Sequence, residues 1–411
     1  MGYTTRVAQH IASRVAVSGR RYLVAAFGDA GHAFPAIALG RALRRRGHDV
    51  LVETWERWRV PVEDEGLRFT AAEEYKTFPP APLADGEASV AEAALALAPL
   101  MAEFRPDIVV SDILTLATAL AAERAGCRRA TLIPHVYPVH AAGMPFFAFG
   151  TQPPRTPVGR ALWRAWLPVL TSGLRRGRRE MNEIRAAVGL PPAGELHGGI
   201  SAELALVGTF PQLEYPRRWP GHVHVTGPMA YEMAYPAIDL PDGQGPLVLV
   251  APSTAHDPEL RLVRASLEAL ADEPVRVVAT ANRQVGDGAL PEAPANAVVV
   301  DWLSYSQVMA DAALVVCHGG HGTVARALGA GVPVLCCPHV GDMAENSARV
   351  AWAGAGLMVP SRLLGPRSLR WAVRRMLSDR RFEAQAAGIA AWARENDGAE
   401  RGAALVEQLA R

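Results

Sequence analysis

Short runs of apolar residues alternate with amphipathic stretches along the chain, a pattern that predicts buried strands alternating with helices. In the first half, apolar runs at 22–27 and 48–54 flank a helical pattern over 36–46. A second series of the same kind begins at 247–251. Further strands are expected at 107–111, 129–133, 202–207, 222–226, 275–280, 297–300, 313–317 and 332–336. Two such series predict an α/β protein with two doubly wound, Rossmann-like domains that face each other across a cleft.

The places where this pattern breaks divide the chain. Residues 134–192 form a long insertion rich in Pro, Trp and Arg. We expect it to contain helices that cover a cleft, because a structureless loop of that length is unusual. The stretch 227–245 is rich in Pro, Gly and Tyr and lacks periodicity, as a linker would. The expected divisions are an N-terminal extension at 1–20, a first domain at 21–226, the linker at 227–245, a second domain at 246–385 and a C-terminal helical segment at 386–411.

The most informative stretch, 312–338, reads as strand, glycine-rich turn, helix and strand, which is the unit of a parallel sheet. Glycines at such a turn let the backbone approach a ligand closely. The free N–H groups at the helix start favour an anion, and the helix dipole adds ~0.3–1 kcal/mol per charge. We therefore expect a diphosphate at this turn, which consists of His318, Gly319, Gly320, His321, Gly322 and Thr323. The two histidines and Cys317 would be an incomplete metal set, so we expect no metal.

Composition narrows the class of protein. The 411 residues are 50% hydrophobic, which suffices for two domains. A net charge of +1 gives no global field that would attract nucleic acid or a membrane surface. The 4 cysteines lack C-x-x-C spacing, which favours reduced thiols in a cytoplasmic protein. No apolar run approaches ~20 residues, so we expect no transmembrane helix.

Beyond these patterns, the chain resembles the family 1 glycosyltransferases, in the variant found in actinobacterial antibiotic biosynthesis. The donor signature of that family is matched by 318–323 and by the segment from Gly341 through Asn346. Its acceptor motif is matched by Gly31-His32 and by 46–50. The resemblance implies the GT-B fold, with the C-terminal helix at 386–411 crossing back onto the N-terminal domain. It also implies transfer that inverts the anomeric carbon and needs no metal.

The resemblance assigns roles to residues of this sequence. His32 is the candidate general base, since a histidine with a pKa near ~6.5 is suited to accept the proton of an acceptor hydroxyl at neutral pH. Asp112 matches the carboxylate that orients this histidine, with Asp29 as a rival. The glycine-rich turn holds the diphosphate, and its helix dipole takes the place of a metal. Further donor positions are matched by Ser253 and Thr254 (diphosphate), Trp302 (nucleotide base), and Asp342 and Met343 (sugar hydroxyls).

Two departures from the family pattern concern the identity of the donor. Arg326 stands eight residues after His318, where UDP-glucose enzymes of the family carry a glutamate that accepts hydrogen bonds from both ribose hydroxyls. Arginine has no acceptor, and Met343 in place of glutamine removes a donor and an acceptor at the sugar. We therefore predict transfer of a deoxysugar from a dTDP-sugar co-substrate to a hydroxyl of a natural-product aglycone, without a cofactor.

Other functions stay open at this point. The same fold could use a UDP-hexose, epimerise a sugar nucleotide, or serve as a catalytically silent partner that activates a true transferase. The long insertion disfavours an epimerase, and the presence of both His32 and the diphosphate turn disfavours a silent partner. A nicotinamide dehydrogenase is disfavoured because 28–31 does not begin a G-x-G-x-x-G motif. The expected partners are a nucleotide sugar and a small-molecule acceptor, with no nucleic acid and no membrane. The acceptor, the linkage and a homodimer are left open.

Overall fold

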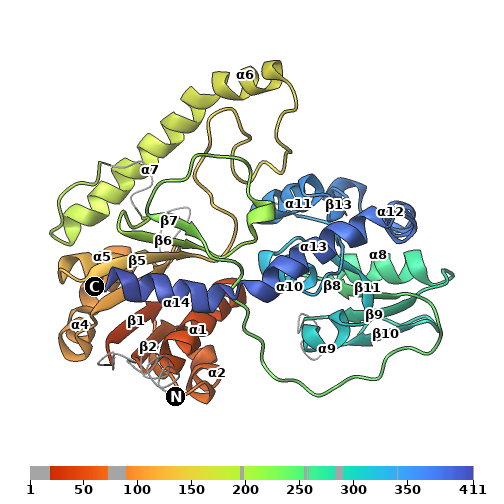
Figure 1. Cartoon of the computed structure of the whole chain (residues 1–411), viewed down its shortest axis with the longest axis horizontal. Coiled ribbons are helices and arrows are strands. Elements are labelled where there is room, and N and C mark those ends of the chain that lie inside the picture. The colour runs from red at the N-terminus through yellow and green to blue at the C-terminus, as the bar shows by residue number, and fades with distance from the viewer. Residues whose placement is uncertain are drawn as a thin grey trace, which may run out of the picture.

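Two parallel β-sheets frame the molecule in a computed structural model that describes residues 19–72, 89–194, 199–253, 257, 259–282, 290–339 and 341–410. The strand order is β3-β2-β1-β4-β5-β6-β7 in the first sheet and β10-β9-β8-β11-β12-β13 in the second. Helices cover both sheets (Figure 1), which confirms the predicted doubly wound architecture. The strands are β1 (Arg21–Ala25), β2 (Asp49–Thr54), β3 (Arg68–Ala71), β4 (Ile108–Asp112), β5 (Arg128–Ile133), β6 (Leu204–Val207), β7 (Val223–Val225), β8 (Leu247–Ala251), β9 (Arg276–Thr280), β10 (Ala297–Val300), β11 (Ala312–Cys317), β12 (Val334–Cys336) and β13 (Gly356–Met358).

The hydrophobic pattern missed β3 and β13, which are both edge strands. An edge strand is covered on fewer sides than a central one, so it needs no continuous apolar run. β3 reads Arg-Phe-Thr-Ala and buries none of its residues, and β13 has three residues. The central strands β1, β4 and β8 are buried almost throughout, and each was predicted from its apolar run.

α1 and α10 begin earlier than the pattern predicts, and both carry site residues. α1 starts at Ala30, so His32 lies in its first turn; Pro35 hid this start, because a proline inside a helix removes a hydrogen bond and is read as a boundary. α10 starts at His321, so the predicted turn is half helix. The helices are α1 (Ala30–Arg45), α2 (Arg59–Asp64), α3 (Val90–Ala96), α4 (Ala98–Phe104), α5 (Leu116–Arg124), α6 (Pro157–Ala165), α7 (Leu167–Ala187), α8 (Arg261–Leu270), α9 (Tyr305–Met309), α10 (His321–Gly329), α11 (Asp342–Trp352), α12 (Pro366–Ser378), α13 (Arg381–Glu395) and α14 (Gly398–Leu409), with 3-10 turns η1 (Glu56–Trp58), η2 (Pro211–Leu213) and η3 (Ser361–Leu363).

The last helix, α14, lies beside α1 on the N-terminal sheet (Figure 1), as the GT-B resemblance implied. Asp397 caps its start by accepting hydrogen bonds from the backbone N–H groups of Ala399 and Glu400, at 2.9 and 3.0 Å. Ala403 and Val406 enter the hydrophobic core of the first sheet. The preceding helix, α13, packs against α10 instead, so the chain crosses between the two halves at the break before α14.

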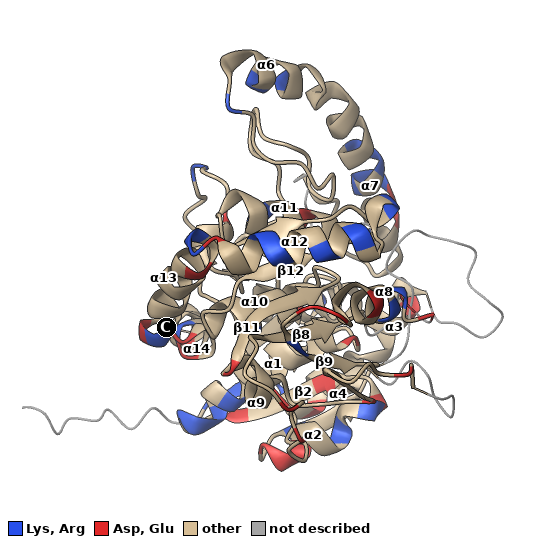
Figure 2. Ribbon diagram, turned by 90° about the vertical axis from the view of Figure 1, so that its right-hand side faces the viewer, with Lys and Arg blue, Asp and Glu red and all other residues tan. Residues whose placement is uncertain are grey.

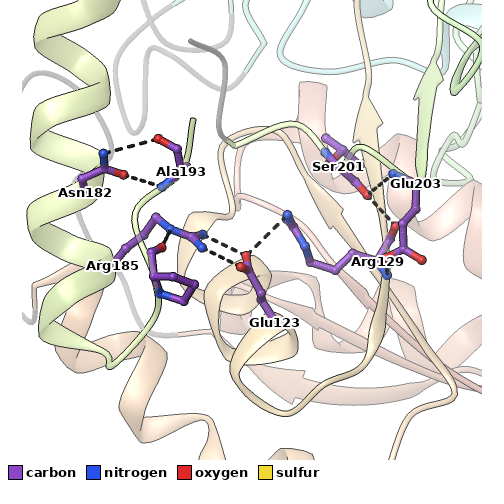
Figure 3. A network of polar contacts seen from close by, with 9 residues as sticks. Glu123, Arg129, Asn182, Arg185, Ala193, Ser201 and Glu203 are labelled. Atoms are coloured by element: carbon purple, nitrogen blue, oxygen red, sulfur yellow. Dashed lines mark hydrogen bonds and ion pairs between the residues drawn. The ribbon is translucent and has the colours of Figure 1, made fainter. Parts of the chain in front are cut away.

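The insertion predicted at 134–192 contains α6 and α7, which form an arm that stands away from both sheets (Figure 1). A polar network fixes the base of the arm to α5 (Figure 3): Arg185 of α7 donates to Glu123 of α5 at 2.6 and 2.9 Å. Further out, arginines at 175–179 lie along α7 and are largely exposed (Figure 2). No helix in the described part of the chain has the length and apolar character needed to cross a bilayer.

Candidate active site

His32 and Asp112 meet at the carboxyl edge of the first sheet, where β1 and β4 are neighbours. The Nδ1 atom of His32 lies 2.8 Å from Oδ1 of Asp112. Asp112 is buried, and its other oxygen accepts from the backbone N–H of Phe27 at 3.2 Å and the hydroxyl of Thr115 at 3.4 Å. Because a carboxylate only accepts, Nδ1 carries the hydrogen and Nε2 is left to receive a proton. The structure thus joins the two residues predicted to act together.

The surroundings of His32 set its proton affinity. Burial by itself disfavours the charged imidazolium, but the Asp112 carboxylate and its hydrogen bond outweigh this cost, with smaller contributions from Asp29 and Asp342. The pKa of His32 is therefore raised above 6.5. Asp29, the rival orienter, is exposed and pairs with Arg57 at 3.4 Å, so the orienting contact belongs to Asp112.

The glycine-rich turn at 318–323, which we call the donor turn, is shaped by close packing of its own backbone. Gly319 has a φ of +84°, and a Cβ atom there would collide with the Ser347 hydroxyl and lie 2.7 Å from the carbonyl oxygen of Met343. A Cβ on Gly320 would strike the ring of His318. Only glycine satisfies both the positive φ and the contact at 319. The backbone of the turn therefore packs directly against α11, with no room for a side chain at 319.

His321 joins the donor turn to the first half of the molecule. Its Nε2 lies 3.0 Å from the carbonyl oxygen of Gly208, which follows β6. Burial lowers the pKa of His321 to about 4, so the ring is neutral. With the hydrogen on Nε2, the Nδ1 atom is an acceptor and does not donate to a diphosphate. In this tautomer His321 holds the two halves together, and contact with a diphosphate stays a prediction for His318 and Thr323.

The other predicted donor residues follow strands of the second sheet. Ser253 is buried just past β8, next to β11 in the sheet. Trp302 is half-buried past β10, and Asp342 and Met343 begin α11 after β12. Thr254 lies outside the described residues. Within the described residues, no group of three or more His, Cys, Asp and Glu side chains is arranged to hold a metal ion.

Arg326 is engaged by the backbone rather than left open to a ligand. Its guanidinium donates to the carbonyl oxygens of Gly322, at 3.3 Å, and of Tyr231, at 2.5 Å. It also lies 6.0 Å from the ring centre of Phe34 in α1. Arg326 therefore ties the donor helix to the segment that connects the two sheets, and it offers no lone pair to a ribose hydroxyl.

A buried ion network between the halves was missed by the sequence reasoning. Arg349 of α11 pairs with Glu345 at 2.8 Å and with Glu214, after η2, at 2.9 Å. All three side chains are at most 3% exposed. Burial raises the pKa of Glu214 even though Arg349 opposes this. The i,i+4 spacing of Glu345 and Arg349 is a readable signal of a helix pair, whereas nothing local points to Glu214.

Comparison with known proteins finds one matching family and several similar proteins. Residues 264–400 match the family described as Erythromycin biosynthesis protein CIII-like, C-terminal domain. Over 90% of its length the chain is 29% identical to 4'-demethylrebeccamycin synthase of Lentzea aerocolonigenes, of which it covers 95%. It is 29% identical to O-mycaminosyltylonolide 6-deoxyallosyltransferase of Streptomyces fradiae, over 95% of this chain and 97% of that one.

Solved structures agree with the fold. The glycotransferase of kitacinnamycin superposes with a TM-score of 0.76 at 21% identity, covering 95% of this chain and 99% of that chain. The glycosyltransferase VinC, solved in complex with dTDP, superposes with a TM-score of 0.68 at 22% identity, with coverage of 95% and 99%.

Proposed function

From the premise that the chain is a glycosyltransferase of the antibiotic-biosynthesis type with the GT-B fold, we propose that it moves a deoxysugar from a dTDP donor to a hydroxyl of a natural-product aglycone. The observation that carries this proposal is the His32–Asp112 pair, joined at 2.8 Å. It lies close enough to the second half for the carboxylate of Asp342 to act on His32. A base held by a carboxylate is what an oxygen nucleophile needs for activation.

His32 acts in a single displacement. Its Nε2 accepts the proton of the acceptor hydroxyl while the hydroxyl oxygen forms a bond to the anomeric carbon. The bond from that carbon to the diphosphate oxygen breaks, and dTDP leaves with its electron pair. Because the acceptor enters opposite the leaving group, the anomeric configuration inverts. Asp112 stabilises the imidazolium that results.

The start of α10 stabilises the leaving diphosphate. Its first N–H groups and the positive end of its dipole face the position where negative charge develops. His318 and Thr323 add side-chain donors, and Ser253 approaches from the neighbouring strand. In this proposal the fixed positive potential takes the place of a metal ion, and no cofactor takes part.

The donor residues favour dTDP and a deoxysugar. Arg326 donates hydrogen bonds to backbone carbonyl groups and has no acceptor of its own. A 2′-deoxyribose has no 2′-hydroxyl and therefore needs no such acceptor. Met343 beside Asp342 offers fewer polar contacts to a sugar, and Trp302 would stack on thymine. Two relatives are consistent with this choice, because one is named a 6-deoxyallosyltransferase and VinC was solved with dTDP. Free thiols at all four cysteines fit a cytoplasmic location.

An assay with dTDP-L-rhamnose, UDP-glucose, a panel of polyhydroxylated aglycones and EDTA tests the proposal. We expect dTDP release that depends on an acceptor and is unaffected by EDTA. The glycoside should have the anomeric configuration opposite to that of the donor by NMR. Retention of configuration, loss of transfer in EDTA, or preference for UDP-glucose would contradict the corresponding part of the proposal.

A further inference from the structure

Five aromatic rings form a continuous row through His32, which we call the aromatic row. Neighbouring ring centres lie 5.0, 6.1, 6.2 and 5.8 Å apart. All five residues are partly exposed, and the side chain of His32 is 17% exposed, so the row keeps some exposed surface. In spatial order the row is Trp55, Phe27, His32, His135 and Phe147.

The sheet order explains why these rings meet. β2, β1, β4 and β5 are adjacent in the first sheet, and the segments that follow β2, β1 and β5 carry Trp55, Phe27 and His135. The outer end of the row is firmly held. A side chain at Gly28 would overlap the ring of Trp55, and the Arg57 guanidinium covers that ring at 4.7 Å. The row is therefore a preformed wall in the half of the molecule that lacks the donor turn.

His135 is held in this wall as a neutral ring with one free lone pair. Its Nδ1 lies 2.8 Å from the carbonyl oxygen of Val136, so Nδ1 carries the hydrogen and Nε2 the lone pair. Burial lowers the pKa of His135, and charge on His32 lowers it further, so the ring is neutral at pH 7. His135 is partly exposed between two buried neighbours, and no protein group among the described residues bonds its Nε2.

We propose that the aromatic row binds a flat, hydroxylated aromatic acceptor, and that His135 accepts a hydrogen bond from a second donor group beside the attacked hydroxyl. The inference rests on the proposed function and names the acceptor class for it. Aromatic walls favour planar ring systems, which gain from stacked and edge-to-face contacts. With hydrogen bonds of about 2.7–3.0 Å each, two rings whose centres lie 6.2 Å apart reach two hydroxyl groups on neighbouring carbon atoms.

Two other roles for His135 fit the contacts less well. As a general base it would need a carboxylate partner, but its Nδ1 is taken by a backbone carbonyl and the orienting carboxylate of Asp112 bonds His32. As a donor-binding residue it would raise the donor KM when replaced; it follows β5 of the first sheet, although it lies near enough to Asp342 for that carboxylate to act on it. Both roles make different kinetic predictions, which the following variants separate.

The test compares 2,3-dihydroxyanthraquinone with 2-hydroxyanthraquinone, which differ by one neighbouring hydroxyl, by calorimetry in saturating dTDP. The unaltered protein should bind the diol about tenfold more tightly, the value of one added hydrogen bond. His135→Phe keeps a ring but removes the lone pair, so it should bind both probes equally. His135→Gln places an amide oxygen near the position of Nε2 and should keep the preference.

Kinetics with dTDP-L-rhamnose complete the test. His135→Phe should raise KM for the diol about tenfold and leave kcat, the donor KM and the pH profile unchanged. Phe147→Leu should lower the affinity for both probes by the same factor. Phe149→Leu is the matched control, because Phe149 lies on the same loop, outside the row, and is 62% exposed. It should change the affinity for neither probe.

Several results would overturn the inference: a diol preference that survives His135→Phe, a fall in kcat with a shifted acid limb, or a raised donor KM. Failure of both probes to bind while dTDP still binds would also overturn it and would leave the proposed function intact. Failure of the unaltered protein to bind dTDP would instead overturn the proposed function.

Discussion

The donor turn at 318–323 and the aromatic row around His32 meet at the junction of the two sheets but draw on different parts of the chain. The turn is one contiguous stretch, with Gly319 packed against Met343 and Ser347, and we propose that its backbone binds the diphosphate. The aromatic row collects side chains from several segments of the first half. A diphosphate has a fixed charge that backbone N–H groups can meet, whereas an aglycone is met by side-chain surfaces. Substitutions that distort the backbone of the turn should therefore weaken dTDP binding. Substitutions of the rings should change which acceptors bind.

The largest expected effect comes from replacing the proposed general base, which should change turnover without changing nucleotide binding. His32→Ala should lower kcat by about 10³-fold or more, since a positioned general base is worth up to about 10⁴-fold. The affinity for dTDP should not change, because His32 belongs to the acceptor side. Transfer assays and calorimetry on the same preparation measure both quantities. Unchanged turnover would remove His32 from its assigned role.

The buried network between the halves should carry the next effect. Arg349→Met leaves Glu214 and Glu345 buried without their cation and should cost about 3–5 kcal/mol of unfolding free energy in urea titrations. Arg374→Met is the matched control: it breaks a 2.7 Å ion pair whose arginine is 66% exposed, and it should cost less than about 1 kcal/mol. Equal losses in the two variants would show that burial does not matter at this junction.

Asp112→Asn should change the rate and the pH profile together. The carboxylate raises the pKa of His32, and a general base works above its pKa, so the acid limb of kcat/KM should lie above pH 6.5 in the unaltered enzyme. Without the carboxylate the limb should move to lower pH, while kcat falls by roughly 10²-fold through loss of the correct tautomer. An acid limb that stays in place would exclude Asp112 as the orienter.

A smaller effect is expected from the shape of the turn. Gly319→Ala and Gly341→Ala both place a side chain at positive φ, of +84° and +68°, but only the first meets neighbouring atoms. Both should lose about 1–3 kcal/mol of stability through strain. Gly319→Ala alone should also weaken dTDP binding, by about tenfold in calorimetry, because its neighbours must shift to admit the methyl group. Equal dTDP affinities would mean that the close packing at 319 does not shape the site.

Features that are formed by contiguous residues could be predicted from the sequence. The residues of 312–338 are contiguous, so the strand, the glycine-rich turn and the helix were predicted from their own pattern. His32 and Asp112 were paired through the family resemblance, and the fold supplies the contact between them. The start of α1 was missed because Pro35 interrupts the helical pattern that continues through it.

What the sequence did not reveal depends on contacts between distant segments. Glu214 finds Arg349 only when η2 packs against α11. Trp55, His135 and Phe147 could be read from the sequence either as acceptor-pocket residues or as core packing, and their neighbours in the aromatic row are set only when adjacent strands align their carboxyl ends. His321, predicted as a diphosphate donor, turns out to bond the carbonyl of Gly208 across the junction. In each case the partner is set by tertiary structure and carries no signal in the neighbouring residues.

The most direct measurement of the central claim compares the thermal shift of the protein in dTDP with that in UDP at equal concentrations. A ligand that binds only the native state stabilises it by RT ln(1 + [L]/Kd), so at equal concentrations the larger shift identifies the nucleotide that binds more tightly. We predict a larger shift with dTDP, because Arg326 offers no acceptor to a ribose 2′-hydroxyl. An equal or larger shift with UDP would contradict it.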